Sequence, residues 1–208
     1  MVEPLEPTFS PALTPNLPSS GELLYLSYYY PWYNQGDWSR HDIQDTPELG
    51  LYGTDDLAIA EQHIEWAIRA GISSWVVSWW GPRSLGNDHF EQGMLKADNI
   101  GQIKFCMLYE SKKLTGSFED GTAQSKLTSD IRSIRDDYFD HPSYLRLNGR
   151  PVVVLYIPRA TFGQGFGSHL LDDIRDELDR DIFFIADEPF FGNSHDDPDT
   201  TGSGIRNG

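Results

Sequence analysis

The 208-residue sequence is poor in basic residues, and it has a single cysteine and no long apolar run. Sixteen lysines and arginines stand against 32 aspartates and glutamates, which gives a formal net charge of -16 at pH 7. Nucleic acids and anionic membrane surfaces both attract basic proteins, so this shortage argues against either partner. No apolar stretch approaches the roughly 18 residues of a membrane span, and we therefore expect no transmembrane segment.

The single cysteine, Cys106, excludes an internal disulfide framework. It lies in an apolar run, Phe105 to Leu108, where a buried and unreactive thiol is expected. No two histidines have the spacing of metal ligands, and neither a phosphate-binding loop nor a nucleophile elbow is present. The N-terminus lacks the basic and apolar regions of a signal peptide. The compartment stays open, with an extracytoplasmic or secreted location favoured.

Short apolar runs alternate with segments of helical periodicity along the chain. The apolar runs predict strands at residues 22–30, 72–80, 103–109, 151–157 and 182–186. Helices are expected from an N-cap at Thr54 to Gly71, over residues 88–99, around Leu127 to Tyr138, and from a cap at Ser168. Because the strands are continuously apolar, they are typical of a parallel sheet covered by helices.

Two architectures begin with this order, the doubly wound sheet and the (β/α)8 barrel. No Gly-x-Gly-x-x-Gly motif follows the first strand, which disfavours a dinucleotide-binding sheet. Aromatic or acidic residues at the strand ends favour the barrel, whose active sites gather at that face. We therefore predict an α/β fold, a parallel (β/α) barrel of TIM type with only its first five strands. Two open sheet edges imply either a longer protein or self-association through those edges.

Composition divides the chain into three parts. Residues 1–21 are a proline-rich linker or arm, residues 22–191 are the barrel portion, and residues 192–208 are an acidic, glycine-rich tail. The tail places Asp197, Asp199 and Thr201 at ligand positions of a calcium loop, but Gly208 stands where such a loop needs glutamate. We interpret it as a flexible acidic tail.

Two aromatic clusters follow the first two strands. The first is Ser27 to Tyr33 and the second is Trp79 to Gly81. Flat aromatic walls suit a flat, partly apolar ligand such as a sugar ring, so both clusters together indicate a pocket. The alternative is that these are ordinary core aromatics.

The same regions resemble glycoside hydrolase family 99, whose best-known members are endo-α-mannosidases. The matching segments are Tyr29 to Tyr33, Pro47 to Asp56, Ser78 to Gly81, His141 to Arg146 and Asn148 to Pro151. They occur in the family's order between about residue 24 and residue 188. The resemblance implies a (β/α)8 barrel that cleaves within α-mannosidic glycans with retention, without a metal or organic cofactor.

The resemblance also implies a catalytic Glu-x-x-Glu pair in an aromatic-flanked stretch late in the barrel. No such stretch follows the fifth predicted strand, so the catalytic pair cannot be carried over. The aromatic lining that faces substrate does carry over. It comprises Tyr29, Trp32, Tyr33, Tyr52, Trp79, Trp80 and Tyr109.

Carboxyl groups at strand ends are the remaining candidates for chemistry. Glycoside hydrolysis usually needs two of them, and Glu110 and Glu188 follow the third and fifth strands. They are weak catalytic candidates, and a role in binding sugar hydroxyls or positioning loops is favoured, with Glu110 expected to line the pocket. In the first long loop, His41 with Asp42 either binds a sugar hydroxyl or phosphate or is simply solvated.

Two classes of function are left open. The first is the N-terminal part of a glycoside hydrolase whose partner is an oligosaccharide or polysaccharide substrate. The alternative is a non-catalytic carbohydrate-binding protein that keeps the aromatic lining. Two half-barrels that complete each other remain a third possibility.

Overall fold

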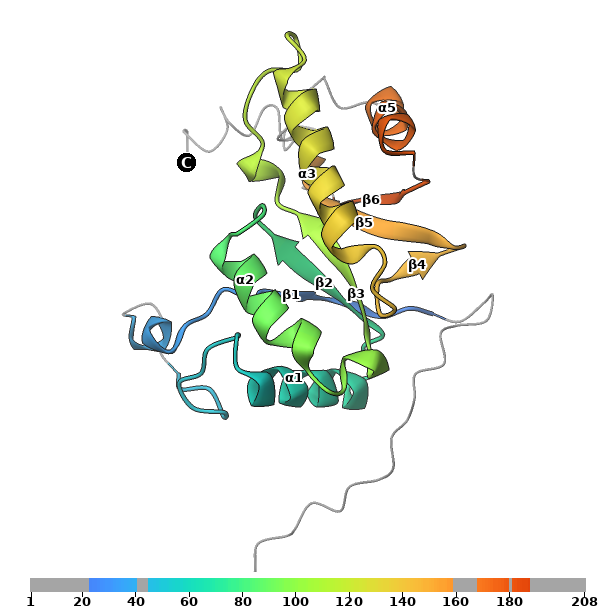
Figure 1. Cartoon of the computed structure of the whole chain (residues 1–208). Coiled ribbons are helices and arrows are strands. Elements are labelled where there is room, and N and C mark those ends of the chain that lie inside the picture. Colours follow the sequence, from blue (N-terminus) through green and yellow to red (C-terminus); the bar gives the residue numbers. More distant parts are fainter. Residues whose placement is uncertain (1–22, 41–44, 159–167, 180, 188–208) are drawn as a thin grey trace, which may run out of the picture.

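The computed structural model describes residues 23–40, 45–158, 168–179 and 181–187 (Figure 1). The predicted arm, the predicted tail with its calcium-like spacing, and the candidates His41, Asp42 and Glu188 lie outside these residues.

The centre of the fold is a curved sheet of six strands. Five of them run parallel in the order β1-β2-β3-β5-β6, which confirms the predicted parallel sheet and its five strands. The sixth, β4, pairs antiparallel with β5. Their bounds are β1 Leu26–Tyr29, β2 Ser74–Trp79, β3 Lys104–Tyr109, β4 Arg146–Leu147, β5 Arg150–Tyr156 and β6 Phe183–Asp187.

The turn between β4 and β5 is the predicted Asn-Gly turn. Asn148 and Gly149 both have positive φ angles, 52° and 78°, as a two-residue hairpin turn requires. The hairpin precedes the strand with the most continuous run of valine and leucine.

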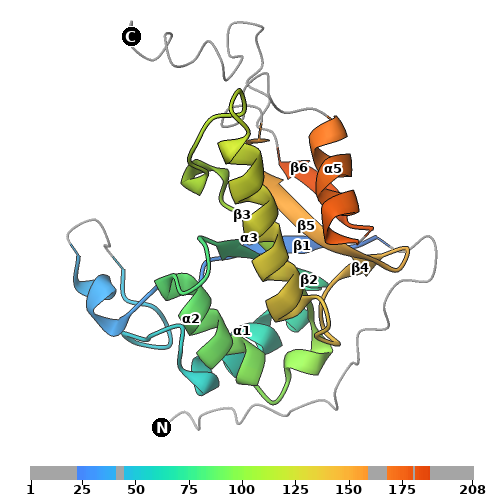
Figure 2. The same ribbon diagram turned by 45° about the horizontal axis from the view of Figure 1, so that its top comes forward.

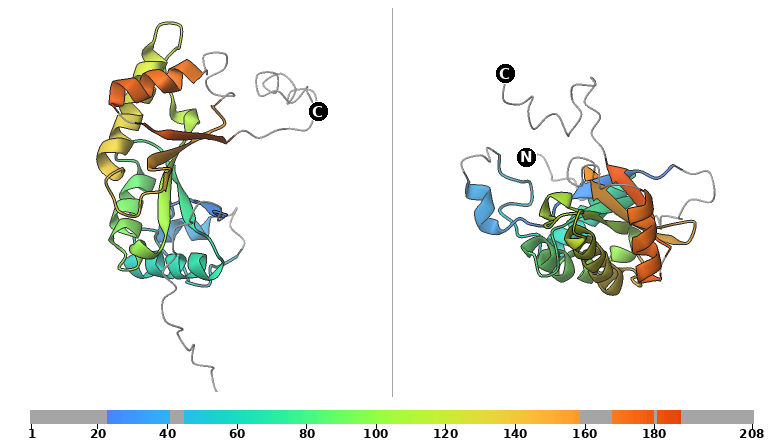
Figure 3. Two further views of the ribbon diagram at one scale, coloured as in Figure 1. Left: turned by 90° about the vertical axis from the view of Figure 1, so that its right-hand side faces the viewer. Right: turned by 90° about the horizontal axis from the view of Figure 1, so that it is seen from above.

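Four α-helices of the described residues lie along the sheet. They are α1 Leu57–Arg69, α2 Leu85–Gln92, α3 Thr122–Tyr138 and α5 Ser168–Leu178. The left view of Figure 3 shows α2, α3 and α5 on one side of the strands. Tyr109 of β3 donates a hydrogen bond to Asp130 of α3 at 3.0 Å, so alternate strand residues face this helical layer. No helix in the described part of the chain has both the length and the apolar character to span a membrane.

Helix α1 begins two residues later than the sequence predicts. Its N-cap is Asp56, whose carboxylate accepts hydrogen bonds from the backbone N–H groups of Ala58 and Ile59. The predicted cap, Thr54, is buried and its hydroxyl instead lies 3.2 Å from the Tyr33 carbonyl and 3.0 Å from His89. Gly71, with a φ of 79°, follows the end of the helix as predicted.

Helix α2 is also displaced from its predicted range of residues 88–99. It begins after Ser84, which caps it, and ends at Gln92. Gly93 packs against the loop before α1 so closely that a Cβ at position 93 would lie 2.5 Å from the Thr54 carbonyl oxygen. Short 3₁₀ turns at Met94–Lys96 and Ile100–Gln102 then complete the connection to β3.

The face of the sheet opposite the helices is concave. Tyr28 on β1 donates a hydrogen bond to the carboxylate of Asp187 on β6, although these strands are the two outer strands of the parallel set. Side chains on opposite edges can meet only if the sheet curls toward them. This curvature is that of a partial barrel.

Candidate functional site

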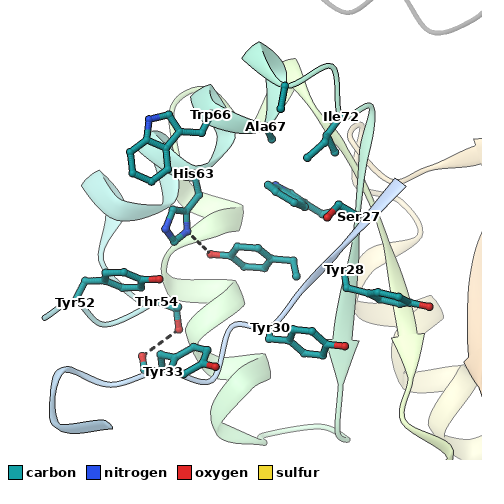
Figure 4. A pocket seen from close by; sticks show the side chains of 13 residues that line it. Ser27, Tyr28, Tyr30, Tyr33, Tyr52, Thr54, His63, Trp66, Ala67 and Ile72 are labelled. Carbon is teal, nitrogen blue, oxygen red and sulfur yellow. Dashed lines mark hydrogen bonds between the residues drawn. The ribbon is translucent and has the colours of Figure 1, made fainter. Parts of the chain in front are cut away.

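The carboxyl ends of the parallel strands bring a group of aromatic and acidic side chains together on the concave side. Residues two apart in a strand point to the same face, so Tyr28 and Tyr30 face away from Tyr29. Figure 4 shows Tyr28 and Tyr30 on one side of β1, and His63, Trp66 and Tyr52 on the other. We call the group on the concave side the concave cluster; it comprises Tyr28, Tyr30, Trp32, Ser78, Trp80, Glu110, Tyr156 and Asp187.

The aromatic members of the cluster form a continuous wall. The ring centroids of Tyr28 and Tyr30 are 6.2 Å apart, those of Tyr30 and Trp32 are 4.7 Å apart, and those of Trp32 and Trp80 are 6.1 Å apart. Tyr28 and Tyr30 are 43% and 38% exposed, so this wall is open to a ligand. Such an arrangement offers flat apolar surfaces with hydroxyl and indole N–H groups at their rims.

A buried carboxyl group lies beside this wall. Glu110 is 5% exposed, and its Oε1 accepts a hydrogen bond of 2.5 Å from the Ser78 hydroxyl. That hydroxyl in turn accepts a bond of 2.9 Å from the indole N–H of Trp80. Burial raises the pKa of Glu110, and the Ser78 hydrogen bond and the charge of Lys112 act in the opposite direction.

Tyr30 lies close enough to both acidic groups of the cluster for their charges to act on it. Burial raises its pKa, and the neighbouring Glu110, Tyr156 and Asp187 raise it further. Burial and the bond to Asp187 likewise raise the pKa of Tyr28. Both phenols therefore keep their protons at neutral pH and can donate hydrogen bonds.

A second aromatic site lies around the outer edge of β1. It is a groove of about 460 Å³ between β1 and α1, shown in Figure 4, and Tyr28 and Tyr30 of the concave cluster also border it. Here the Tyr29 hydroxyl lies 3.2 Å from Nδ1 of His63, and burial lowers the pKa of that histidine. Tyr33 and Tyr52 line the same groove, and the rings of both contact Trp38, with centroids 4.9 and 4.8 Å away. Trp38 belongs to the 3₁₀ turn Gln35–Ser39, which stands out beside α1 and α2 in Figure 2.

The predicted substrate-binding residues thus fall into three places. Trp79 and Tyr109 are 2% and 1% exposed, and their rings stack at 5.8 Å within the core under the helices. Tyr29, Tyr33 and Tyr52 line the outer groove. The concave cluster contains Trp32, Trp80 and Glu110.

Several members of the cluster were missed by sequence reasoning. Tyr28 and Tyr30 lie in the aromatic stretch that the sequence singled out, and strand alternation would have separated them from Tyr29. Asp187 directly precedes Glu188, the strand-end acid that the sequence analysis selected in its place. Ser78 lies in the matching segment Ser78 to Gly81 but was not selected, because a serine within an apolar run does not stand out.

Metal-ligating residues do not gather in the described ranges. No group of three or more histidine, cysteine, aspartate or glutamate side chains there could hold a metal ion.

A parallel, partly closed barrel with aromatic and acidic side chains at its strand ends is the arrangement of a barrel-type glycoside hydrolase. The model of glycosyl hydrolase family 99 matches residues 36–162, more than half of the chain. The chain belongs to glycosyl hydrolase family 99.

Solved structures give the same result. The chain is 26% identical to a family 99 endo-α-mannosidase from Bacteroides thetaiotaomicron in complex with BIS-TRIS-propane, with a TM-score of 0.64 over 85% of this chain and 56% of that chain. Another structure of the endo-α-mannosidase from that organism is 23% identical, with a TM-score of 0.58 over 85% of this chain and 58% of that one. A glycoside hydrolase-like protein, 17% identical, has a TM-score of 0.60 over 86% of this chain and 55% of its own. The chain thus spans little more than half the length of these proteins. A comparison with curated proteins found no match.

Proposed function

We propose that the concave cluster is a glycan-binding face of a family 99 glycoside hydrolase. The observation that carries this proposal is the open wall of Tyr28, Tyr30, Trp32 and Trp80 beside the hydrogen-bonded carboxyl group of Glu110. Sugars have apolar ring faces and hydroxyl-rich edges, and this face offers a matching partner for each. The named endo-α-mannosidase, 26% identical, supports α-mannosidic or related glycans as the ligand.

In this proposal the aromatic and polar residues have separate roles. Trp32 and Trp80 stack against pyranose rings. Glu110 and Asp187 accept hydrogen bonds from sugar hydroxyls, and the hydroxyl of Tyr30 donates one. Trp79 and Tyr109 support this face from the core and do not touch the glycan.

The proposed reaction is retaining, endo-type cleavage of the glycan. That chemistry takes two carboxyl groups about 5 to 5.5 Å apart, one as acid and one as nucleophile. We assign Glu110 to binding, because its carboxylate is already held by Ser78 and the family resemblance places the catalytic glutamate pair later in the barrel.

Isothermal titration of an α-mannose oligosaccharide tests the proposal. Trp80→Ala should weaken binding about fivefold to thirtyfold, since losing one aromatic stacking contact costs about 1 to 2 kcal/mol. Trp66→Ala is the matched control, because Trp66 is 36% exposed and lies in the outer groove. Equal affinity in wild type and Trp80→Ala, or a loss confined to Trp66→Ala, would overturn the assignment.

A non-catalytic carbohydrate-binding role would use the same face. It is favoured by one observation: the two carboxylates of the concave cluster, Glu110 and Asp187, both accept hydrogen bonds from protein hydroxyls. Incubating the chain with the oligosaccharide and following its cleavage by chromatography tests the non-catalytic role. Cleavage would contradict it, whereas binding without cleavage fits both roles, because the family resemblance places the catalytic glutamate pair later in the barrel.

A further inference from the structure

Ser78 joins the aromatic and acidic halves of the concave cluster. Its side chain is buried, with 1% of the residue exposed, and its hydroxyl has two partners. It accepts a hydrogen bond from the indole N–H of Trp80 at 2.9 Å and donates one to Glu110 at 2.5 Å. A single hydroxyl group thus has its donor and one acceptor site committed to the two neighbours.

The backbone explains why these three groups meet. Ser78 and Trp80 are two residues apart at the end of β2, so their side chains lie on the same face. The pairing of β2 with β3 sets Ser78 beside Leu108, and the backbone N–H of Glu110 donates to the Trp79 carbonyl at 3.2 Å. The strand register therefore fixes the backbone positions of Ser78 and Glu110, and the two hydrogen bonds of the Ser78 hydroxyl link the side chains of Trp80 and Glu110.

We propose that Ser78 is a positioning residue that holds the Trp80 ring and the Glu110 carboxylate in one relative orientation. A pyranose ring stacked on Trp80 would then meet Glu110 with a hydroxyl at its rim. This role rests on the proposed glycan-binding function. It assigns to Ser78 a part in selecting sugars whose stacked face and rim hydroxyl match that orientation.

The arrangement couples the protonation of Glu110 to Trp80. When Glu110 is ionised, Ser78 donates to it, and a hydroxyl that donates is a better acceptor for the indole N–H. When Glu110 is protonated, its own O–H competes with the indole for the Ser78 oxygen. In the part of the chain that the structure describes, the other titratable groups that interact with Glu110 are Lys112 after β3 and Tyr30 after β1, and neither interaction passes through Ser78.

A measurement without sugar tests the coupling. In the wild-type chain, the indole N–H signal of Trp80 in a ¹H–¹⁵N spectrum, assigned with Trp80→Phe, should move downfield as Glu110 ionises. In Ser78→Ala this movement should disappear. Ser74→Ala is the matched control, because Ser74 is equally buried on β2 and, within the described ranges, its hydroxyl donates a hydrogen bond to the Trp75 carbonyl at 3.3 Å and not to the concave cluster.

Glu110→Gln keeps the test decisive if Ser78→Ala does not fold. The Trp80 signal should then be independent of pH across the carboxyl range. A wild-type signal that does not titrate, or one that titrates unchanged in Ser78→Ala or Glu110→Gln, overturns the inference.

Sugar binding gives a second and separate readout. Ser78→Ala should lower the affinity for the α-mannose oligosaccharide about tenfold, the scale of a lost hydrogen-bond network to a charged group, and Ser74→Ala should leave it unchanged. If the wild-type chain binds no oligosaccharide, the proposed function fails, and the spectrum still decides whether Ser78 couples the two groups. If sugar binds and Ser78→Ala binds equally well, the positioning role fails alone.

Discussion

The neighbouring residues Trp79 and Trp80, at the end of β2, differ in their surroundings: Trp79 lies in the core and Trp80 on the concave face. Trp79 is 2% exposed and stacks on Tyr109, and its indole N–H has no hydrogen-bond partner among the described residues. Its contribution is therefore packing alone. Trp79→Ala should lower the free energy of unfolding by about 3 to 5 kcal/mol, and Trp80→Ala by much less. Urea unfolding measures both, and equal losses would contradict the assignment of Trp80 to an open face.

The raised pKa of Glu110 predicts a stability that depends on pH. Burial makes the ionised carboxyl less favourable in the folded chain than in the unfolded one. Wild-type stability should therefore fall as pH rises from the ordinary glutamate pKa through the raised one, a loss that Glu110→Gln avoids. The melting temperature of Glu110→Gln relative to wild type should rise as the pH increases above the ordinary glutamate pKa, and should level off once the carboxyl group is ionised in the folded chain as well.

Thermal unfolding followed by circular dichroism measures this difference, with the exposed Glu119→Gln as the control. If the difference in melting temperature between Glu110→Gln and wild type is the same at every pH, burial does not raise the pKa of the Glu110 carboxyl group.

At the scale of elements, the N-cap residue Asp56 stabilises the start of α1, directly after the aromatic loop. Asp56 accepts hydrogen bonds from two backbone N–H groups of the first turn, at 2.8 and 3.4 Å. Asp56→Ala should destabilise the chain by about 1 kcal/mol, as loss of an N-cap does. Asp55→Ala, at the exposed residue just before the cap, should cost less in the same denaturant titration. A larger loss for Asp55→Ala would mean that the helix is capped differently.

Much of the sheet could be predicted from the sequence, because continuous apolar runs leave few alternatives to buried parallel strands. The starts of α1 and α2 could not, since Thr54 is as good a cap by type as Asp56. What decided between them was the contact of Thr54 with the Tyr33 carbonyl and His89, both distant in sequence. Likewise, α2 ends before Gly93, because the loop that contains Thr54 packs directly against the backbone of that glycine.

The sequence predicted only part of the candidate site, because the rest depends on contacts between segments that are distant in the chain. Strand-end position identified Glu110 and Trp80, which do lie on the concave side. Separating Trp80 from Trp79 requires knowing which face of β2 each occupies, and β2 is buried on both faces, so its apolar pattern does not show this. Ser78 acquires its importance only from the register between β2 and β3.

At the scale of the whole molecule, the parallel strands of the sheet have two outer members, β1 and β6, and the β1 edge is apolar. Tyr25 and Leu26 at the β1 edge are 61% and 39% exposed, next to the outer groove. Self-association through such an edge stays a prediction. The chain covers 56% and 58% of the two family 99 structures similar to it, so the surfaces beside β1 and β6 are where further barrel units would pack.

The central claim, that glycans bind the concave face, can be tested in one experiment. The chain has six tryptophans, whose indole N–H signals can be followed together in a ¹H–¹⁵N spectrum during titration with an α-mannose oligosaccharide. The account predicts that the signals of Trp32 and Trp80 shift, and that those of Trp66 and Trp75 in the outer groove stay in place. Shifts confined to Trp66 and Trp75 would contradict it and move the binding site to the groove beside β1.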